Sequence, residues 1–243
     1  SENISNALNG CDQVVNLAAL ISIPYSFESS KLYVDTNIYG TLNILNAAKK
    51  KKLEKIIITS TSEVFGSCKK SPMDEMHPLN SQSPYAASKT SADQLAKSFH
   101  ASFDLPIVIL RPFNTFGPRQ SLKAIIPTII TQALKKPKNI KLGNINTARD
   151  FNYVKDITSA FLNVIESQNK KIYGQDYNIG SGKYLKISEI IKIISSILKV
   201  KLNVNFESKR LRPNQSEVLK LIADNTKFKK EFNWAPKFSK NDK

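Results

Sequence analysis

The sequence is poor in the residues on which metal sites and disulfide frameworks depend. Its 243 residues include two cysteines, Cys11 and Cys68, without a CxxC spacing, and two histidines, His77 and His100. So few thiol and imidazole groups argue against a disulfide framework and against a zinc site. We therefore expect no metal ion in this protein.

The sequence also lacks a long hydrophobic run. No apolar stretch approaches the roughly 18 residues that a membrane helix needs, and the N-terminal SENISNALNG has neither the basic start nor the apolar stretch of a signal peptide. These absences predict a soluble protein of the cytoplasm with no membrane partner. Because 41% of its residues are hydrophobic, the chain is able to bury a substantial core.

Acidic residues are scarce relative to basic ones. The chain has 20 Asp and Glu against 36 Lys and Arg, a formal net charge of +16, and such an excess is compatible with nucleic-acid binding. The lysine clusters at 49–52, 135–138 and 227–230 are nevertheless dispersed, which is typical of a solvated surface. No zinc finger or RNA-recognition signature accompanies them. We expect no nucleic-acid partner, although a basic surface would attract an anionic small substrate.

Strand-like and helix-like segments alternate through the first half of the chain. Apolar runs at 13–17, 55–60 and 106–110 are separated by helical patterns at 33–50 and 84–102, and this alternation is typical of a parallel sheet with crossover helices. After residue 118 the segments become shorter, with helices expected at 125–134, 156–166 and 188–198 and a strand at 201–205. The predicted fold class is α/β, with a doubly wound parallel sheet and a smaller C-terminal lobe over its edge.

One pair of residues has a spacing that suits catalysis. Tyr85 and Lys89 in PYAASK are four residues apart, so both side chains lie on one face of a helix. A match of this kind arises about once by chance in a chain with 8 Tyr and this much Lys. Two unrelated residues on a helix surface therefore remain an alternative.

The segment before this helix strengthens the catalytic interpretation. The apolar run at 55–60 leads directly into Thr61, Ser62 and Glu63. Hydroxyl and carboxylate groups at the C-terminal end of a parallel strand lie where α/β sheets bind ligands. A strand-ending turn with a helix cap is the alternative for Thr61 and Glu63.

Several segments together resemble one enzyme family. In order along the chain, they are NLAAL, DTNIYGTLNILNAAK, IIITSTSEVFG, SPYAASK, ILRPFNTFGPRQ, ARDFNYVKDI and YNIGSG. They are similar to the successive motifs of extended short-chain dehydrogenase/reductases that act on nucleotide sugars, and they cover nearly the whole chain. The best match is to 4,6-dehydratases, and the runs NLAALISIPYSF and RPFNTFGPRQSLKAIIPTII are most similar to dehydratases of N-acetylhexosamines.

The resemblance implies an NAD-dependent nucleotide-sugar 4,6-dehydratase. Residues 1–118 would be the remainder of a Rossmann-like NAD-binding domain that carries the catalytic residues. Residues 119–243 would be mainly a substrate-binding lobe, from which some segments return to the Rossmann sheet. A nucleotide diphosphate sugar is the expected partner, and a homodimer is expected because many relatives are dimers.

Glycine is missing where such a domain needs it. A dinucleotide-binding sheet carries a glycine-rich turn after its first strand, where the amides of a helix N-terminus hold the pyrophosphate. None of the eight glycines supplies a GxxGxxG or GxGxxG pattern. We therefore expect an N-terminally truncated sheet, and weak NAD binding by these residues alone.

The resemblance assigns catalytic roles to five residues: Thr61, Ser62, Glu63, Tyr85 and Lys89. Tyr85 would take the proton of the sugar C4 hydroxyl, helped by the positive charges of Lys89 and the nicotinamide, which favour the phenolate. Thr61 would bind the same hydroxyl, and Glu63 would remove the C5 proton as water leaves from C6. Ser62 stands where glucose dehydratases have an aspartate that protonates the leaving hydroxyl, so the proton donor stays open between Glu63 and a water.

The resemblance also implies two binding sets. The cofactor set is Leu17, Ala18, Ala19, Asn37, Ser60, Tyr85, Lys89 and Phe113. For Leu17, Ala18 and Ala19, the alternative is that small residues pack at the end of a strand. The substrate set is Asn114, Arg149 and Arg212. Arginine suits a diphosphate because its planar donors engage phosphate oxygens in pairs, and a solvent-exposed ion pair is the alternative for each arginine.

Three rival functions remain. A UDP-glucuronate decarboxylase has a similar TSEVYG motif but requires a cation that faces the sugar carboxylate. A 4-epimerase has no need of Glu63, because inversion at C4 requires no base at C5. A non-catalytic protein that binds a sugar nucleotide or a nucleic acid is the rival from another class.

Overall fold

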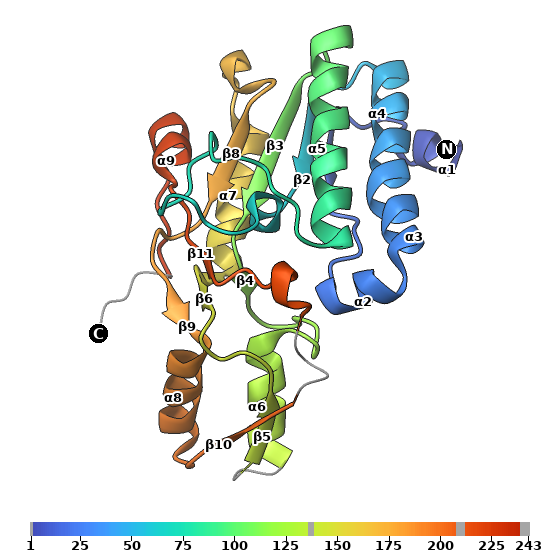
Figure 1. The fold of residues 1–243 in the computed structure, drawn as a ribbon. Helices are drawn as coiled ribbons and strands as arrows, with labels where there is room; N and C mark the ends of the chain where they lie inside the picture. The colour runs from blue at the N-terminus through green and yellow to red at the C-terminus, as the bar shows by residue number, and fades with distance from the viewer. Residues whose placement is uncertain (1, 136–138, 208–211, 239–243) are drawn as a thin grey trace.

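The computed structural model describes residues 2–135, 139–207 and 212–238 (Figure 1). Its centre is a four-stranded sheet in the order β1-β2-β3-β8. The strands are β1 (Gln13–Asn16), β2 (Lys55–Thr59), β3 (Ile107–Pro112) and β8 (Asp176–Ile179). All three pairings are parallel, and in the register Ile57 lies between Val15 and Val108. The predicted parallel sheet is thus confirmed.

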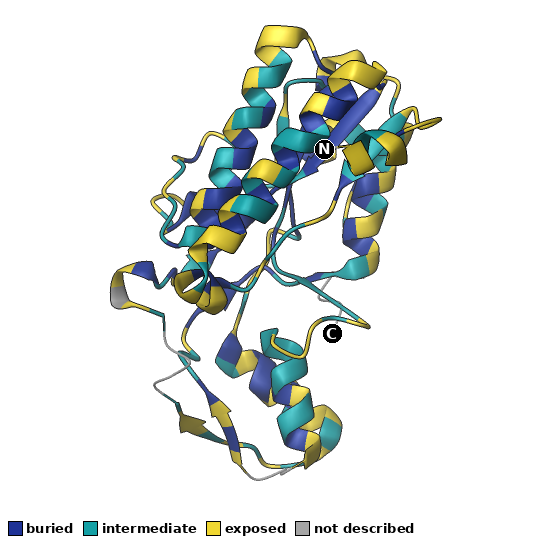
Figure 2. Ribbon diagram, turned by 90° about the vertical axis from the view of Figure 1, so that its right-hand side faces the viewer, coloured by how far each residue is buried: buried dark blue, intermediate teal, exposed yellow. Residues whose placement is uncertain are grey.

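Helices cover both faces of this sheet. One face carries α1 (Glu2–Ala7), α4 (Gly40–Lys51) and α5 (Pro84–Phe103), and the other carries α7 (Val154–Glu166) and α9 (Thr226–Phe232). Successive side chains of a strand point to opposite faces, so Ile56 and Ile58 join the first helix layer and Ile57 joins the second. Buried residues lie along the strands and on the helix sides that face them (Figure 2). This two-sided burial explains why β2 is almost wholly apolar.

The connection between β1 and β2 contains an irregular helix. After α2 (Ile23–Glu28), the chain forms α3 (Ser30–Tyr33), a π-helical turn η1 (Val34–Tyr39) and then α4 without a break. The sequence predicts one regular helix over 33–50. The structure begins the helix earlier and inserts the π turn, a feature that often marks functional positions in proteins.

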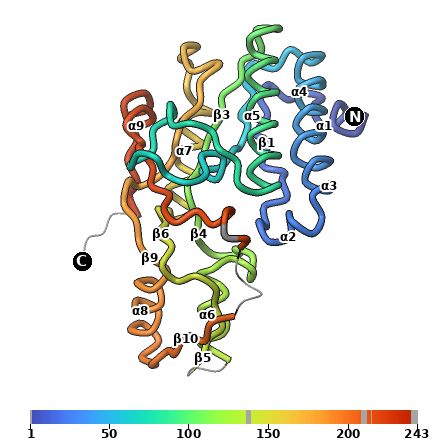
Figure 3. Tube along the Cα trace, viewed as in Figure 1, coloured from blue at the N-terminus to red at the C-terminus, as the bar shows by residue number. Residues whose placement is uncertain are grey.

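A smaller lobe lies beyond the carboxyl ends of the strands. Figure 1 shows the arrowheads of β2 and β8 pointing toward it, and the tube in Figure 3 shows its separation from the sheet. Its elements are α6 (Ile125–Lys135), α8 (Ile187–Leu198), β5 (Asn139–Leu142) and β10 (Asn203–Phe206), and β10 pairs in parallel with β5. They enclose their own cluster of isoleucines and leucines.

Short elements connect the sheet and the lobe. The pairs are β4 (Thr115–Phe116) with β7 (Asn152–Tyr153), and β6 (Ala148–Arg149) with both β9 (Leu185–Lys186) and β11 (Lys220–Leu221). The described residues also include the 3-10 turns η2 (Ser62–Phe65), η3 (Lys170–Ile172) and η5 (Asn214–Ser216). The strand β8 and the helices α7 and α9 follow residue 118, yet β8 belongs to the main sheet and the two helices pack against it. The expected division at 118 into a cofactor-binding part and a substrate-binding part stays a prediction.

Across the described residues, every helix is too short or too polar to cross a membrane.

Candidate active site

The carboxyl end of β2 turns sharply into η2. Thr61 caps this turn, because its hydroxyl accepts a hydrogen bond from the Glu63 amide at 3.3 Å. The turn ends at Gly66, whose φ of +61° is in the region that favours glycine, and an added Cβ would lie 2.0 Å from the Asn80 carbonyl oxygen. The helix cap foreseen as an alternative is therefore present. It also orients the segment that carries Ser62, which is buried, and Glu63.

The helix α5 begins beside this turn. Ser83 caps it by accepting from the Ala86 amide at 3.1 Å, and Pro84 occupies the first helical position. Tyr85 is 7% exposed and Lys89 is 4% exposed. The two residues are thus on the buried face of α5, and the alternative of two helix-surface residues is wrong.

The Tyr85 phenol lies in a confined environment. Its ring meets the edge of the Tyr33 ring, with centroids 6.2 Å apart and an interplanar angle of 77°. Burial raises the pKa of Tyr85 well above its ordinary value, a hydrogen bond with Thr61 lowers it, and the negative charge of Glu63 raises it again. Without a bound ligand, the phenol is therefore protonated at neutral pH.

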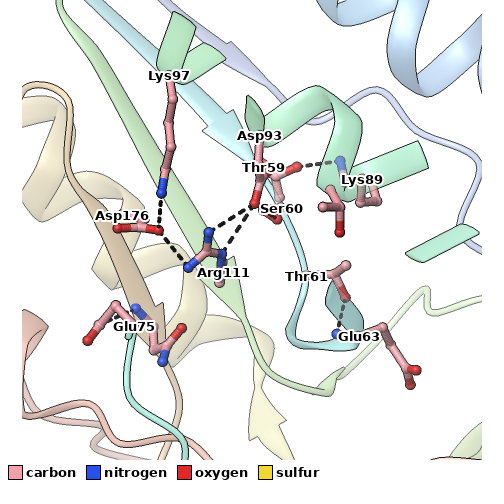
Figure 4. A network of polar contacts seen from close by, with 12 residues as sticks. Thr59, Ser60, Thr61, Glu63, Glu75, Lys89, Asp93, Lys97, Arg111 and Asp176 are labelled. Carbon is pink, nitrogen blue, oxygen red and sulfur yellow. Dashed lines mark hydrogen bonds and ion pairs between the residues drawn. The ribbon is translucent and has the colours of Figure 1, made fainter. Parts of the chain in front are cut away.

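The Lys89 ammonium is directed at the end of β2. It donates a hydrogen bond to the Thr59 carbonyl oxygen (Figure 4). Burial lowers the pKa of Lys89, and the Asp93 carboxylate raises it. The sequence predicts that Lys89 acts on Tyr85, whereas in this structure Asp93 is the charge that acts on Lys89.

Glu63 lies within a group of two arginines. The Arg212 guanidinium is 3.4 Å from Glu63 Oε2. Burial lowers the pKa of Arg149, and the charge of Glu63 raises it. Figure 4 shows Glu63 extending away from Arg111 and its partners. The structure thus brings the expected general base together with both arginines expected to bind substrate, although they are far apart in sequence.

The segment that follows β1 forms an exposed edge of small residues. Leu17 is 66% exposed and Ala18 is also exposed. The Ala18 amide donates to Asn16 Oδ1 at 3.2 Å, so the side chain of Asn16 fixes the backbone at Ala18. A flat backbone segment of this kind at the carboxyl end of a parallel strand suits contact with a dinucleotide.

Asn37 joins the segment after β1 to the helix α5. Its amide donates to the Leu20 carbonyl at 3.0 Å and accepts from the Leu20 amide at 2.9 Å. The same amide donates to Ser88 Oγ at 2.9 Å. The side chain of Asn37 therefore holds the segment after β1 against α5, and its expected contact with the cofactor stays a prediction.

Two further residues of the expected cofactor set point into the protein. Ser60 donates its hydroxyl to Asp93 Oδ2 at 2.8 Å. Phe113 is 1% exposed and packs with Val64, Phe65 and other apolar residues. The Phe113 side chain is therefore part of the core and not of the surface of the site.

Asn114, of the expected substrate set, has an unsatisfied buried atom. Within the described part of the chain, its side-chain Oδ1 has no hydrogen-bond partner. A buried acceptor without a partner costs free energy, so this atom suits a ligand contact.

The sequence reasoning did not identify Tyr33, Ser88, Asp93 and Arg111 as residues that support the site. One signal was present: Asp93 follows Lys89 by four residues, as Lys89 follows Tyr85, which places all three on one helix face. Among the residues described, no three His, Cys, Asp or Glu side chains are grouped so as to hold a metal ion.

Known proteins are similar to this chain in sequence and in fold. The family model described as GDP-mannose 4,6 dehydratase matches residues 1–242. The putative UDP-glucose 4-epimerase of Methanocaldococcus jannaschii is 31% identical over 229 residues, which cover 92% of this chain and 71% of that protein.

Two solved structures extend the comparison. UDP-glucuronic acid 4-epimerase from Bacillus cereus, in complex with UDP-glucuronic acid and NAD, matches with a TM-score of 0.90 and 31% identity over 97% of this chain and 73% of that one. A double mutant of dTDP-glucose 4,6-dehydratase from Streptomyces venezuelae, with NAD bound, matches with a TM-score of 0.87 and 26% identity over 97% of this chain and 71% of that one.

These likenesses confirm the Rossmann-like α/β fold predicted from the sequence. The similar proteins include both dehydratases and epimerases, so they support an enzyme acting on nucleotide sugars and leave its reaction open. Since the family model covers almost the entire sequence, this chain belongs to the GDP-mannose 4,6-dehydratase family, with the fold of extended short-chain dehydrogenase/reductases.

Proposed function

We propose that this chain carries the active site of an NAD-dependent nucleotide-sugar 4,6-dehydratase. The observation that carries the proposal is the position of Glu63, two residues after Thr61 on the turn that ends β2 and close enough to Tyr85 for its charge to raise the Tyr85 pKa. Oxidation of a sugar at C4 acidifies the C5 proton, and a carboxylate beside the C4-binding groups is suited to remove it.

The residues that face the proposed NAD site fit the nicotinamide half of that cofactor. Leu17 and Ala18 are exposed after the carboxyl end of β1, and hydrogen bonds with Asn16 and Asn37 hold the segment to which they belong. When bound, NAD supplies reversible oxidation and reduction of the sugar. Lys89, already buried at the end of β2, would bind the ribose hydroxyls.

Tyr85 and Thr61 would act on the C4 hydroxyl. The raised pKa of the Tyr85 phenol keeps the proton in place until a positive charge arrives beside it. Tyr85 would then accept the hydroxyl proton as a general base, and Thr61, which already hydrogen-bonds Tyr85, would bind the same oxygen. The confined ring of Tyr85 favours this geometry because few other rotamers are open to it.

Arg149, Arg212 and Asn114 would bind the substrate. A diphosphate would compete with Glu63 for Arg212, and the 3.4 Å separation of that ion pair is long for a charge-assisted hydrogen bond. Binding of the diphosphate would therefore release Glu63 for the chemical step. We propose an N-acetylhexosamine as the sugar, on the similarity of NLAALISIPYSF and RPFNTFGPRQ to dehydratases of that substrate class.

Ser62 leaves the proton donor for the C6 hydroxyl to another group. Its side chain is a buried hydroxyl and not a carboxylic acid. We propose that Glu63 returns the proton it has taken from C5, directly or through a water, to the departing hydroxyl at C6. Proton removal and proton donation then balance on one carboxyl group.

Mass spectrometry tests the proposed reaction. The purified protein is incubated with NAD and either UDP- or GDP-N-acetylglucosamine in deuterium oxide. We expect loss of one water from the sugar and incorporation of one solvent deuterium at C5. A substrate that is turned over without either change would refute the dehydratase.

A 4-epimerase and a UDP-glucuronate decarboxylase are the second candidates, because proteins of the epimerase type are among the similar ones. Both use Tyr85 and Lys89 in the same way. The arginines beside Glu63 supply the cation that a decarboxylase requires. Release of carbon dioxide from UDP-glucuronate, or inversion at C4 without loss of water, would identify these reactions.

We further propose a homodimer through the outer face of α5. A shallow hollow there is lined by Ile38, Thr90, Ser91, Gln94, Leu95 and Ser98. Light scattering coupled to size-exclusion chromatography tests it, and a mass of one chain at micromolar concentration would contradict it.

A further inference from the structure

A buried carboxylate beneath the site has no part in the proposed reaction. Asp93, on α5, is 0% exposed. Its Oδ2 atom accepts a hydrogen bond from Ser60 Oγ at 2.8 Å and from Arg111 at 3.2 and 3.3 Å (Figure 4). An isolated buried charge would be costly, so these partners explain how a carboxylate is tolerated between helix and sheet.

Arg111 is held from its other side by a second carboxylate. Its Nη1 atom is 2.7 Å from Asp176 Oδ2, on β8, and Lys97 Nζ is 2.9 Å from the same oxygen. Arg111 therefore lies between carboxylates from α5 and β8. With both in place, the guanidinium is fixed and so is its hold on Asp93.

Asp93 is also aligned with the catalytic pair. Tyr85, Lys89 and Asp93 follow one another at intervals of four residues on the buried face of α5. Lys89 donates to the Thr59 carbonyl, and Asp93 accepts from the neighbouring Ser60. Residues from consecutive turns of α5 are thus hydrogen-bonded to two consecutive residues, Thr59 and Ser60, at the end of β2.

One atom of Asp93 is left over. Within the described residues, Oδ1 has no hydrogen-bond partner although it is fully buried. A fully satisfied structural ion pair would use both oxygens. The Asp93 charge also acts on Lys89, because it raises the Lys89 pKa against the effect of burial.

We propose that Asp93 is a positioning residue for the dehydratase site: it anchors Ser60 at the end of β2 and supplies the negative charge that keeps the Lys89 ammonium in place. This inference rests on the proposed function for its consequence in catalysis, but its effect on Lys89 is independent of any substrate. Burial raises the pKa of Asp93, and the Arg111 guanidinium opposes this by favouring the charged carboxylate.

The charges around Lys89 determine the direction in which its pKa should change when Asp93 is neutralised. Burial lowers the pKa of Lys89 and Asp93 raises it. The groups that face Asp93 are Arg111 from β3 and Lys89 from α5, with Tyr85 on the same helix face. Neutralising Asp93 removes the charge that opposes the effect of burial, so Lys89 should lose its proton at lower pH.

An NMR titration tests this without any ligand. The chain is labelled with 13C-lysine, and the Cε signal of Lys89 is assigned by its disappearance in Lys89→Arg. In Asp93→Asn we expect the Lys89 titration midpoint to move to lower pH. In Asp176→Asn, which removes a carboxylate of equal charge from the far side of Arg111, we expect it to stay at the wild-type value. Equal midpoints in Asp93→Asn and wild type overturn the inference.

Two additions keep the test decisive. Should Asp93→Asn fail to fold because Arg111 is left unpaired, the double variant Asp93→Asn/Arg111→Met removes both charges, and the same shift of Lys89 is expected. In the dehydratase assay, Asp93→Asn should lower kcat about tenfold with little change in KM. If wild type shows no dehydration, the proposed function fails, while the titration still decides the role of Asp93.

Discussion

The molecule contains two clusters of opposite charges, and they are built differently. Asp93, Arg111 and Asp176 lie on regular elements of the main sheet and its helix layer and are joined at 2.7 to 3.3 Å, and Asp93 and Arg111 are fully buried. Glu63 and Arg212 lie on a turn and an irregular segment, and their closest atoms are 3.4 Å apart. The first cluster is joined by the shorter contacts, and the second has the longer contact that the proposed diphosphate would replace.

This difference separates structural from functional charges. A buried ion pair is strongly destabilising to break, because one charge is left without a partner. The Glu63–Arg212 pair is longer and its arginine is 20% exposed, so it should contribute less to stability, and a phosphate would be able to replace Glu63. We therefore expect substitutions in the first cluster to change stability and substitutions in the second to change activity.

The largest effect is expected for Arg111→Met. It leaves Asp93 buried without its main partner, so the free energy of unfolding should fall by about 3 to 5 kcal/mol. Urea denaturation measures it. Asp93→Asn/Arg111→Met is the matched control and should recover much of the loss, since no charge is left unpaired. If Arg111→Met were as stable as wild type, the two clusters would not differ in their contribution to stability.

Glu63→Gln should be inactive but stable. The amide keeps the size of the side chain and removes the base, so dehydration should fall by about a hundredfold or more. Its control is Glu75→Gln, which changes a carboxylate that binds the Asn178 amide away from the site and should leave activity intact. An epimerase would stay active in Glu63→Gln, so full activity of this variant points to that rival.

Arg212→Gln should weaken substrate binding. Loss of one charge-assisted contact to a diphosphate should raise the Kd for UDP or GDP about tenfold, while the free energy of unfolding changes by less than about 1 kcal/mol. Calorimetry and urea denaturation give the two numbers. Arg119→Gln, in an exposed loop, is the control with no expected change. A large loss of stability in Arg212→Gln would place this residue with the structural charges.

The smallest effect is expected for the pH dependence of the stability that Asp176 contributes. Burial raises the pKa of Asp176, but Arg111 and Lys97 outweigh burial and hold it below its ordinary value. The carboxylate therefore contributes stability above about pH 4, and this contribution is lost as the pH falls toward the folded-state pKa. Wild type and Asp176→Asn should differ by about 1 kcal/mol at pH 6 and converge at lower pH in urea denaturation. A constant difference across this range would contradict the assignment.

Local patterns in the sequence were sufficient for much of the fold. The run Ile56 to Ile58 has no polar interruption because both its faces are covered. The four-residue spacing of Tyr85 and Lys89 placed them on one helix face, and the structure shows that face to be buried. Such features depend on neighbours within a turn or a strand, so propensity and periodicity reveal them.

Other features escaped the sequence reasoning because their partners are remote. The π turn at 34–39 has no local signal, and its value lies in directing Asn37 to both Leu20 and Ser88. Phe113 follows the RP of a binding motif, yet the sheet beneath it turns its side chain into the core. Nothing near Phe113 in the sequence distinguishes a ligand contact from a core contact.

The order of residues along the chain was enough to predict the elements and their parallel arrangement, because these depend on periodicity and on residue chemistry. The three-dimensional fold alone determined which groups share an environment. Glu63 meets Arg212 across 149 residues, and Ser60 meets Asp93 across 33. Electrostatic interactions act through space and not along the chain, so only the folded arrangement sets the charge state and the partner of each group.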